Sequence, residues 1–77
     1  MKELVEFVAR SLVDNPDEVR VTQLGRDASS SVIELRVAPE DLGKVIGRQG
    51  RTARALRTLL SVASARSSRR CTLDIVD

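Results

Sequence analysis

Residues 41–60 of the chain are DLGKVIGRQGRTARALRTLL, and the architecture of the whole chain can be inferred outward from them. At its centre, Gly47-Arg48-Gln49-Gly50 forms a Gly-x-x-Gly tetrapeptide between two segments with helical periodicity. Two glycines three residues apart let the backbone turn tightly and leave no Cβ to block the approach of a ligand. Gly50 precedes the longer segment, and the free N–H groups and dipole of a helix start favour an anion such as phosphate. A bare Gly-x-x-Gly is a weak motif, because glycines between two helices are usually turn residues only, so its surroundings must decide.

Positive charge surrounds this tetrapeptide. The net charge of the 77 residues is only +2, but between Leu42 and Leu73 there is no acidic residue. The basic residues of that segment are Lys44, Arg48, Arg51, Arg54, Arg57, Arg66, Arg69 and Arg70. Such an asymmetry creates a local positive field that suits a polyanion. A solvated basic helix face has the same composition, so charge alone does not establish nucleic-acid binding.

The tetrapeptide joins two predicted helices. Pro39-Glu40-Asp41 opens the short one, because proline fits the first helical position and acids suit the positive end of the dipole. We expect it to run to about Ile46, where Gly47 takes the left-handed conformation that ends helices. The long helix is expected from Arg51 to about Arg66, with Ser67-Ser68 as its breaker. Its predicted buried face consists of Ala53, Leu56, Leu59, Leu60 and Ala63, while Arg51 and Arg54 point away.

Outside this segment, periodicity predicts one more helix and three strands. The apolar spacing of residues 2–14, with Phe7 beside the stripe, indicates a helix packed on the core. Asn15-Pro16 ends it, because the residue before proline avoids the helical region. Alternation predicts strands at 18–24, 32–37 and 71–76, the first two joined as a hairpin by the polar loop 25–30. The order α-β-β-α-α-β can pack as two layers.

Together these residues resemble a KH domain, in which a Gly-x-x-Gly loop clamps the backbone of about four nucleotides. Residues 41–60 look like the KH signature, and an order that begins with a helix is that of the type II, bacterial version. LVEFVARSLVDNPDEVRV (4–21) and LDIVD (73–77) are similar to the small stand-alone bacterial KH proteins of the KhpA family. The resemblance covers essentially the whole chain. It implies an α+β type II KH domain over residues 1–77, with a three-stranded mixed sheet and three helices on one face.

The resemblance also implies a function and the loop residues that serve it. The chain would bind single-stranded RNA, as an RNA chaperone in post-transcriptional control with links to cell shape and division. The binding cleft would lie between the short helix, the glycine loop, the start of the long helix and a neighbouring strand. Gly47 and Gly50 would shape the loop, while Arg48 and Gln49 would stand at its tip beside the phosphates.

Around the loop, further residues are implied to take part. Val45 and Ile46 would line an aliphatic floor for bases, although apolar residues beside a helix end are usually core residues only. Gly43 would allow close packing of the short helix. Lys44 and Arg54 would add positive charge, or would simply be solvated. The expected RNA-binding set is therefore Gly43, Lys44, Val45, Ile46, Gly47, Arg48, Gln49, Gly50, Arg51 and Arg54.

Composition limits the mode of binding. The chain has no Trp or Tyr, and its one Phe lies in the first predicted helix. It therefore cannot stack bases on aromatic residues as RRM and OB domains do, which leaves an aliphatic groove of low affinity. A second site gained by oligomerisation would raise that affinity by avidity. The resemblance implies a homodimer, and also a heterodimer with a larger multidomain KH protein of the KhpB type.

Other functional classes fit less well. The chain has no His, and no activated Cys or carboxylate pair stands out, so an enzyme, a cofactor or a small-molecule substrate is not expected. The segment GKVIGRQGRT lacks the lysine that a P-loop requires after its second glycine. The single Cys71, interpreted as a small buried hydrophobe, excludes an internal disulfide and a cysteine-based zinc cluster. With no signal peptide and no apolar run that could span a bilayer, we expect a cytoplasmic protein without a membrane partner.

Two alternatives stay open. Helices at 39–46 and 51–66 with a short turn could form a helix-turn-helix reader of duplex DNA, although three flanking strands argue against it. The chain could also be a protein-interaction module that keeps a KH fold without binding RNA. An intact, basic loop favours RNA binding over this second alternative.

Overall fold

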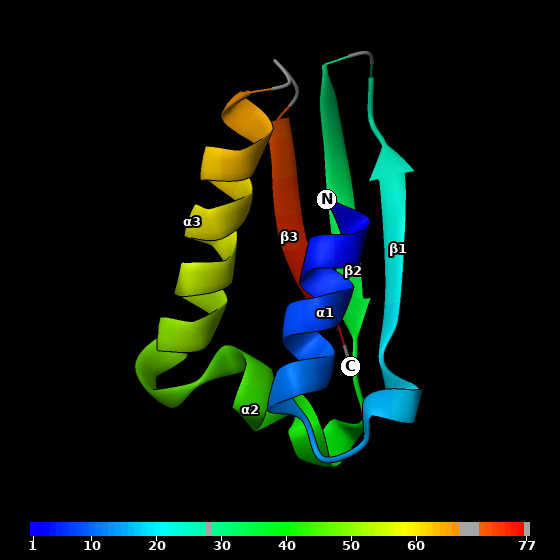
Figure 1. Ribbon diagram of the computed structural model, residues 1–77, viewed down its shortest axis with the longest axis vertical. Helices are drawn as coiled ribbons and strands as arrows, with labels where there is room; N and C mark the ends of the chain where they lie inside the picture. Colours follow the sequence, from blue (N-terminus) through cyan, green and yellow to red (C-terminus); the bar gives the residue numbers. More distant parts are fainter. Residues whose placement is uncertain (28, 67–69, 77) are drawn as a thin grey trace.

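The computed structural model describes residues 1–27, 29–66 and 70–76, and its elements follow the predicted order α-β-β-α-α-β (Figure 1). They are α1 (Lys2–Leu12), β1 (Arg20–Gly25), β2 (Ser30–Arg36), α2 (Leu42–Ile46), α3 (Arg51–Ala65) and β3 (Arg70–Val76). Short 3-10 turns at Pro16–Glu18, Pro39–Asp41 and Arg48–Gly50 precede β1, α2 and α3. The first strand begins later than predicted, because Pro16 opens one of these turns. The predicted break at Ser67-Ser68 lies outside the described residues.

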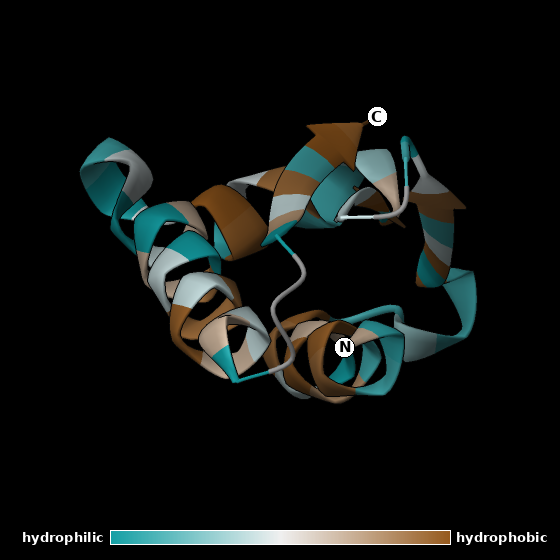
Figure 2. Cartoon of the chain, turned by 90° about the horizontal axis from the view of Figure 1, so that it is seen from above, coloured by the Kyte–Doolittle hydropathy of each residue, from teal (hydrophilic) through white to brown (hydrophobic). Residues whose placement is uncertain are grey.

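The sheet is three-stranded and mixed, with the strand order β1-β2-β3. β1 and β2 are antiparallel, with Val21 opposite Leu35, which confirms the predicted hairpin. β2 and β3 are parallel, with Ile33 beside Leu73, and a parallel return needs a crossover that α2 and α3 supply. Viewed from above, α1 and α3 lie on the same side of the sheet (Figure 2). The predicted α+β architecture is therefore confirmed.

The core lies between the sheet and the helices. Ile33 and Leu35 of the central strand are completely buried, as their alternation with Glu34 and Arg36 predicts. Each such side chain stabilises the fold by roughly 1.5–3 kcal/mol relative to an exposed one. Cys71 is also buried, as predicted, with its Sγ 3.3 Å from Ser31 Oγ. The helices contribute Val5 and Ala9 from α1, Val45 from α2, and Ala53, Leu56 and Leu60 from α3.

The buried faces of two helices are narrower than predicted. In α3, Leu59 is 42% exposed, whereas Ser64 is buried. The buried positions recur every three or four residues and form one stripe, because α3 packs mainly along β3 and meets α2 near its start. In α1, Val5 and Ala9 are buried while Phe7 is 72% exposed. Apolar surface is therefore left on the outer side of both helices.

Candidate nucleic-acid interface

The Gly47–Gly50 loop contains three residues with positive φ. Gly47 (φ 78°, ψ 169°) ends α2, and its N–H donates to Gly43 O at 2.8 Å. Its φ is positive as predicted, but its ψ lies outside the left-handed helical region. Gln49 (φ 57°, ψ 26°) and Gly50 (φ 73°, ψ 16°) are left-handed, and Gly50 N–H closes the turn on Gly47 O at 3.1 Å. Because Gln49 is not a glycine, it stores roughly 1–3 kcal/mol of strain, and such strain clusters at ligand sites.

The two glycines are required for different reasons. A Cβ added at Gly47 would lie 2.3 Å from Thr52 Oγ1 and 2.8 Å from the Thr52 backbone nitrogen, so the start of α3 occupies that space. A Cβ at Gly50 would meet nothing within 4 Å. Gly47 therefore lets the loop pack against α3, whereas Gly50 leaves open surface where a ligand can approach.

A hollow of about 490 Å³ adjoins the loop. Its lining residues, which define the loop hollow, are Ile46, Gly50, Ala53, Arg54, Arg57 and Ile75. Ile46 at the end of α2 is 37% exposed and Ile75 on β3 is half-buried, so two aliphatic side chains face the hollow from different elements. Arg54 and Arg57 are exposed on α3. The arrangement combines an aliphatic surface with positive charge beside an open backbone turn.

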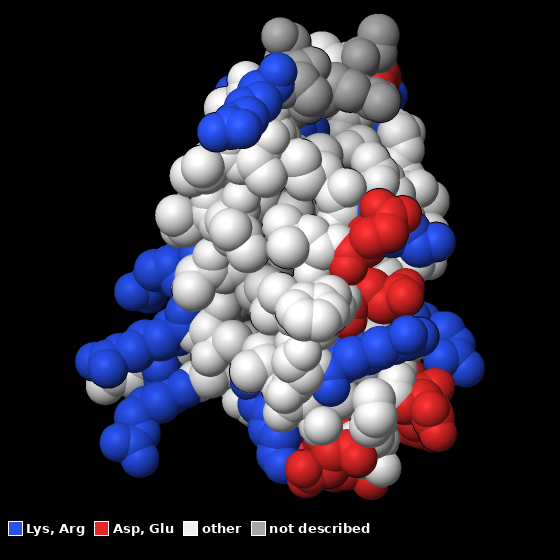
Figure 3. All heavy atoms as spheres, in the orientation of Figure 1, with Lys and Arg blue, Asp and Glu red and all other residues white. Residues whose placement is uncertain are grey.

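The structure brings most of the predicted site residues to this region. Arg48 and Gln49 are exposed in the loop, and Arg51 and Arg54 are exposed in the first turn of α3. Figure 3 shows Lys and Arg side chains projecting as a group from the side where α3 begins, with no acidic side chain among them. Arg51 and Arg54 also border a second apolar surface of α3, which contains Leu59.

Three residues of the predicted RNA-binding set lie in environments that differ from the prediction. Val45 is completely buried in the core and exposes no surface to a base, because it lies on the inner side of α2. Gly43 is exposed, and an added Cβ would meet nothing within 4 Å, so close packing is not its role. Lys44 forms an ion pair with Asp14, at the end of the N-terminal helical segment, and does not line the loop hollow.

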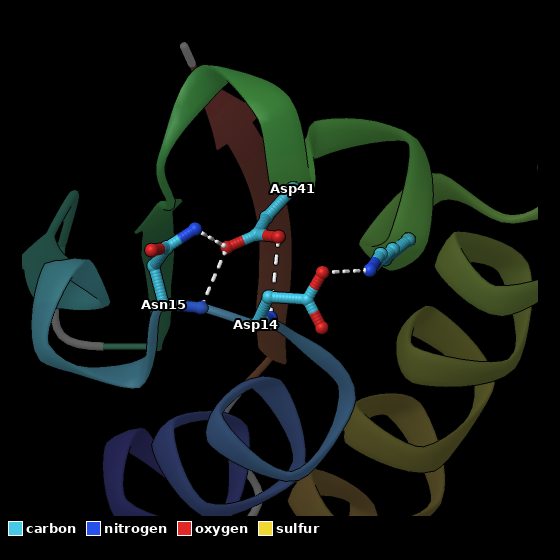
Figure 4. Close-up of polar contacts among 4 residues, drawn as sticks. Asp14, Asn15 and Asp41 are labelled. Atoms are coloured by element: carbon cyan, nitrogen blue, oxygen red, sulfur yellow. Dashed lines mark hydrogen bonds and ion pairs between the residues drawn. The ribbon is translucent and has the colours of Figure 1, made fainter.

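A buried carboxylate joins the end of α1 to the start of α2 (Figure 4). Asp41 is completely buried. Its Oδ1 accepts a hydrogen bond from Asp14 N–H at 3.2 Å, and its Oδ2 accepts bonds from the backbone and side-chain nitrogens of Asn15, both at 3.0 Å. Lys44 is bonded to the Asp14 carboxylate from the next turn of α2. We call these four residues the Asp41 clamp.

Hydrogen bonding in the Asp41 clamp changes two pKa values. Burial by itself would raise the pKa of Asp41, but the hydrogen bonds from Asn15 and from the Asp14 backbone outweigh it and leave that pKa below its ordinary value. The hydrogen bond to the Asp14 carboxylate raises the pKa of Lys44. Both residues are therefore held in their charged forms, which stabilises the junction that precedes the glycine loop.

Sequence reasoning missed several of these features. In the sequence, Asp41 is interpreted as an acid at the start of a helix, and Asn15 as a residue that ends one. No local pattern predicts that Asn15 donates hydrogen bonds to Asp41. Ile75 falls in the strand predicted at 71–76, but the alternation of that strand does not show that Ile75 lies beside the glycine loop. The acid-free segment includes Arg57 among its basic residues, but the sequence does not predict that Arg57 lines the loop hollow.

Within residues 1–27, 29–66 and 70–76, no group of three or more His, Cys, Asp or Glu residues could hold a metal ion. Over the same ranges, no helix is long and apolar enough to cross a membrane.

Comparison with known proteins gives consistent matches. The family described as KhpA/KhpB, KH domain, matches residues 2–75. The chain is similar to the RNA-binding protein KhpA of Halalkalibacterium halodurans, with 54% identity over 77 residues that cover both chains fully. It is 51% identical to the RNA-binding protein KhpA of Aquifex aeolicus over 77 residues, or 100% of this chain and 96% of that one. With the RNA-binding protein KhpA of Clostridium acetobutylicum it shares 49% identity over 76 residues, or 99% of this chain and 100% of that one. No solved structure matches.

Proposed function

The chain belongs to the KhpA/KhpB family of KH domains, and we propose that it binds single-stranded RNA through the Gly47–Gly50 loop and the loop hollow. The names of the similar proteins support RNA as the ligand. The observation that carries the proposal is the open backbone at Gly50, which directly borders a hollow with aliphatic and basic sides. We propose binding rather than catalysis as the activity, and residues 1–77 as one KH domain.

Phosphate is gripped by the loop and the start of α3. The positive end of the α3 dipole lies at Gly50, and Arg48 and Arg51 are exposed on either side of it. Arg54 extends the positive charge along the hollow. Phosphate contacts hold a strand in place without reading its sequence, so this part of the grip is independent of the bases.

Bases rest on the aliphatic surface. Ile46 and Ile75 provide apolar surface for the bases in the loop hollow. The only aromatic residue of the sequence, Phe7, does not line this hollow. Aromatic stacking is worth about 1–3 kcal/mol per base in other single-strand binders, and this chain does without it. A grip on about four nucleotides should therefore be weak in a single copy.

Weak single sites gain from assembly. We propose that the chain forms a homodimer and also pairs with a larger KhpB-type protein, so that two sites act by avidity on one RNA. The outer side of α3 supports this, because Leu59 is 42% and Val62 64% exposed there beside Ala55. We further propose a cytoplasmic role as an RNA chaperone in post-transcriptional control, with effects on cell shape. The same apolar side of α3 favours a second candidate function, a protein-interaction module that acts mainly through its partner.

The double variant Arg48→Asp/Gln49→Asp tests RNA binding. Both side chains are exposed, and aspartate tolerates the left-handed conformation of Gln49, so the fold should persist. Affinity for a single-stranded RNA in fluorescence anisotropy should fall at least about tenfold. One charge-assisted contact is worth roughly 1.5–3 kcal/mol, and about 1.4 kcal/mol is a factor of ten.

A matched control changes the same residue types elsewhere. Gln23→Asp/Arg26→Asp replaces one Gln and one Arg near the end of β1, which lies at the opposite edge of the sheet from α3 (Figure 1). This control should keep most of the affinity. If the loop variant remains folded and binds RNA as tightly as the control, the proposed mechanism is wrong. If the loop variant also still binds its protein partner, this result supports the second candidate function, a protein-interaction module.

A further inference from the structure

The helix that leads into the glycine loop does not hold itself in place. α2 has five residues, and isolated helices shorter than about 12–15 residues are barely stable in water. Its last residue, Ile46, lines the loop hollow, and the next residue, Gly47, begins the loop. A shift of α2 therefore moves the aliphatic side of the hollow and the loop together.

Val45 and Asp41 anchor α2 to the rest of the domain. Val45 is completely buried in the core. Asp41, at the N-cap position of α2, is also completely buried, and its carboxylate accepts hydrogen bonds from Asp14 and Asn15 (Figure 4). Burial of a charge is costly unless hydrogen bonds compensate it, so the carboxylate keeps α2 where these donors reach it. Because Asp41 does not line the loop hollow, its burial serves the position of α2 rather than a contact with RNA.

Asn15 supplies most of the anchor at Asp41. Its backbone nitrogen and its Nδ2 each donate to Asp41 Oδ2 at 3.0 Å. Asn15 lies between α1 and the turn that begins at Pro16, and it does not line the loop hollow. Resting on the proposed function, we infer that Asn15 and Asp41 are positioning residues for RNA binding, which hold α2 where Ile46 and the glycine loop grip the RNA. The connection between α1 and β1 is thereby coupled to RNA affinity.

The variant Asn15→Ala tests this coupling. It removes the side-chain hydrogen bond to Asp41 and keeps the backbone bond, so the domain should stay folded. Affinity for a single-stranded RNA in fluorescence anisotropy should fall about three- to tenfold, as expected if the binding-competent position of α2 becomes populated only about 10–30% of the time. The slope of log affinity against log salt should stay unchanged, because the substitution removes no charge and no phosphate contact.

Hydrogen exchange followed by NMR reports the position of the loop directly. In Asn15→Ala without RNA, the Gly47 N–H, which donates to Gly43 O at the end of α2, should exchange faster through local opening. In the unmodified protein, RNA should in turn slow exchange of the Asn15 N–H that donates to Asp41, by about three- to tenfold, because coupling between two sites is reciprocal. A role in general stability alone would not link Asn15 to RNA in this way.

The chain offers an internal control for the exchange measurement. Ser29 N–H also donates to an aspartate, Asp27 Oδ1 at 2.8 Å, but it lies in the connection between β1 and β2, at the opposite end of the molecule from α2 (Figure 1). Its exchange should change neither in Asn15→Ala nor on addition of RNA. Equal slowing of Ser29 and Asn15 by RNA would show a uniform effect of binding and would overturn the inference.

Two control variants separate positioning from other losses. Gln23→Ala removes another amide side chain, which donates to Ser31 Oγ at 3.4 Å on the far edge of the sheet. Ile33→Val lowers the stability of the core by removing one methylene group. Both controls should keep the RNA affinity of the unmodified protein.

The outcomes distinguish the inference from the proposed function. An affinity of Asn15→Ala equal to that of Gln23→Ala, an equal loss in Ile33→Val, or unchanged exchange of the Gly47 N–H overturns the inference while RNA binding stands. Failure of the unmodified protein to bind RNA overturns the proposed function instead.

Discussion

Replacing Gly47 with alanine should damage the fold far more than the same change at Gly50. Both glycines have positive φ, and both substitutions equally reduce the freedom of the unfolded chain. They differ in what the new methyl group meets, because only the Cβ at position 47 collides with Thr52. The pair of variants therefore separates backbone strain from steric overlap.

The magnitudes follow from these geometries. At Gly50, alanine must adopt a left-handed conformation at a cost of roughly 1–2 kcal/mol. At Gly47, the φ and ψ values belong to a region that is essentially restricted to glycine, with a cost of roughly 1–3 kcal/mol. The overlap with Thr52 adds about 1–3 kcal/mol, as overpacking does elsewhere. Gly47→Ala should therefore lose about 2–6 kcal/mol, a large share of the roughly 4–12 kcal/mol expected for a domain of this size.

Urea denaturation followed by circular dichroism measures both losses, and RNA affinity supplies a second readout. Thr52→Ala in the Gly47→Ala background removes the 2.3 Å contact with Oγ1 but keeps the 2.8 Å contacts with Cβ and the backbone nitrogen, so recovery should be partial. Gly50→Ala should weaken RNA binding more than its stability loss explains, because its methyl group enters open surface at the loop hollow. Equal or greater destabilisation by Gly50→Ala would refute the assignment of Gly47 to packing.

Two other predictions concern the junction before the loop. Gly43→Ala should raise the free energy of unfolding by about 0.5–1 kcal/mol, because Gly43 is helical and an added Cβ would meet nothing within 4 Å. A loss of stability in urea denaturation would contradict this prediction. The pKa of folded Asp41 lies below the ordinary 3.8, so its ionised form contributes stability above pH 3.8, which is lost as the pH falls through the lower folded-state pKa. In Asp41→Asn, the stability deficit relative to the unmodified protein should therefore shrink as the pH falls below about 3.8. A deficit that is constant with pH would contradict the role of the carboxylate charge.

Much of the fold could be predicted because the helices and strands follow from the local periodicity of apolar residues. The alternation around Ile33 and Leu35 identified the central strand and its buried face, and Asn15-Pro16 placed the end of the first helix close to where it occurs. The glycine spacing located the loop, since only glycine takes the conformation of Gly47 without strain. These features depend on residues that are near one another in the chain.

The misplaced residues depend on distant neighbours. Leu59 has the spacing of a buried residue, but α3 has a neighbour along only one stripe, so the next position outward is exposed. Val45 and Ile46 are equally apolar in sequence, yet one is core and the other lines the loop hollow, because they lie on different sides of a five-residue helix. The Asp41 clamp joins residues 26 and 27 positions apart, which no periodicity reports.

The parallel pairing of β2 with β3 has a consequence for synthesis of the chain on the ribosome. Ser30 pairs with Arg70, and Arg36 pairs with Val76. The second edge of β2 therefore has no hydrogen-bonding partner until β3 has been synthesised. Until then Ile33 lacks Leu73 as a neighbour, and α3 lacks the strand along which it mainly packs. Contacts between residues so far apart in sequence form late, since the intervening chain must be closed into a loop first. Cooperative folding, and with it the formation of the loop hollow, is therefore expected to begin only when β3 has left the exit tunnel.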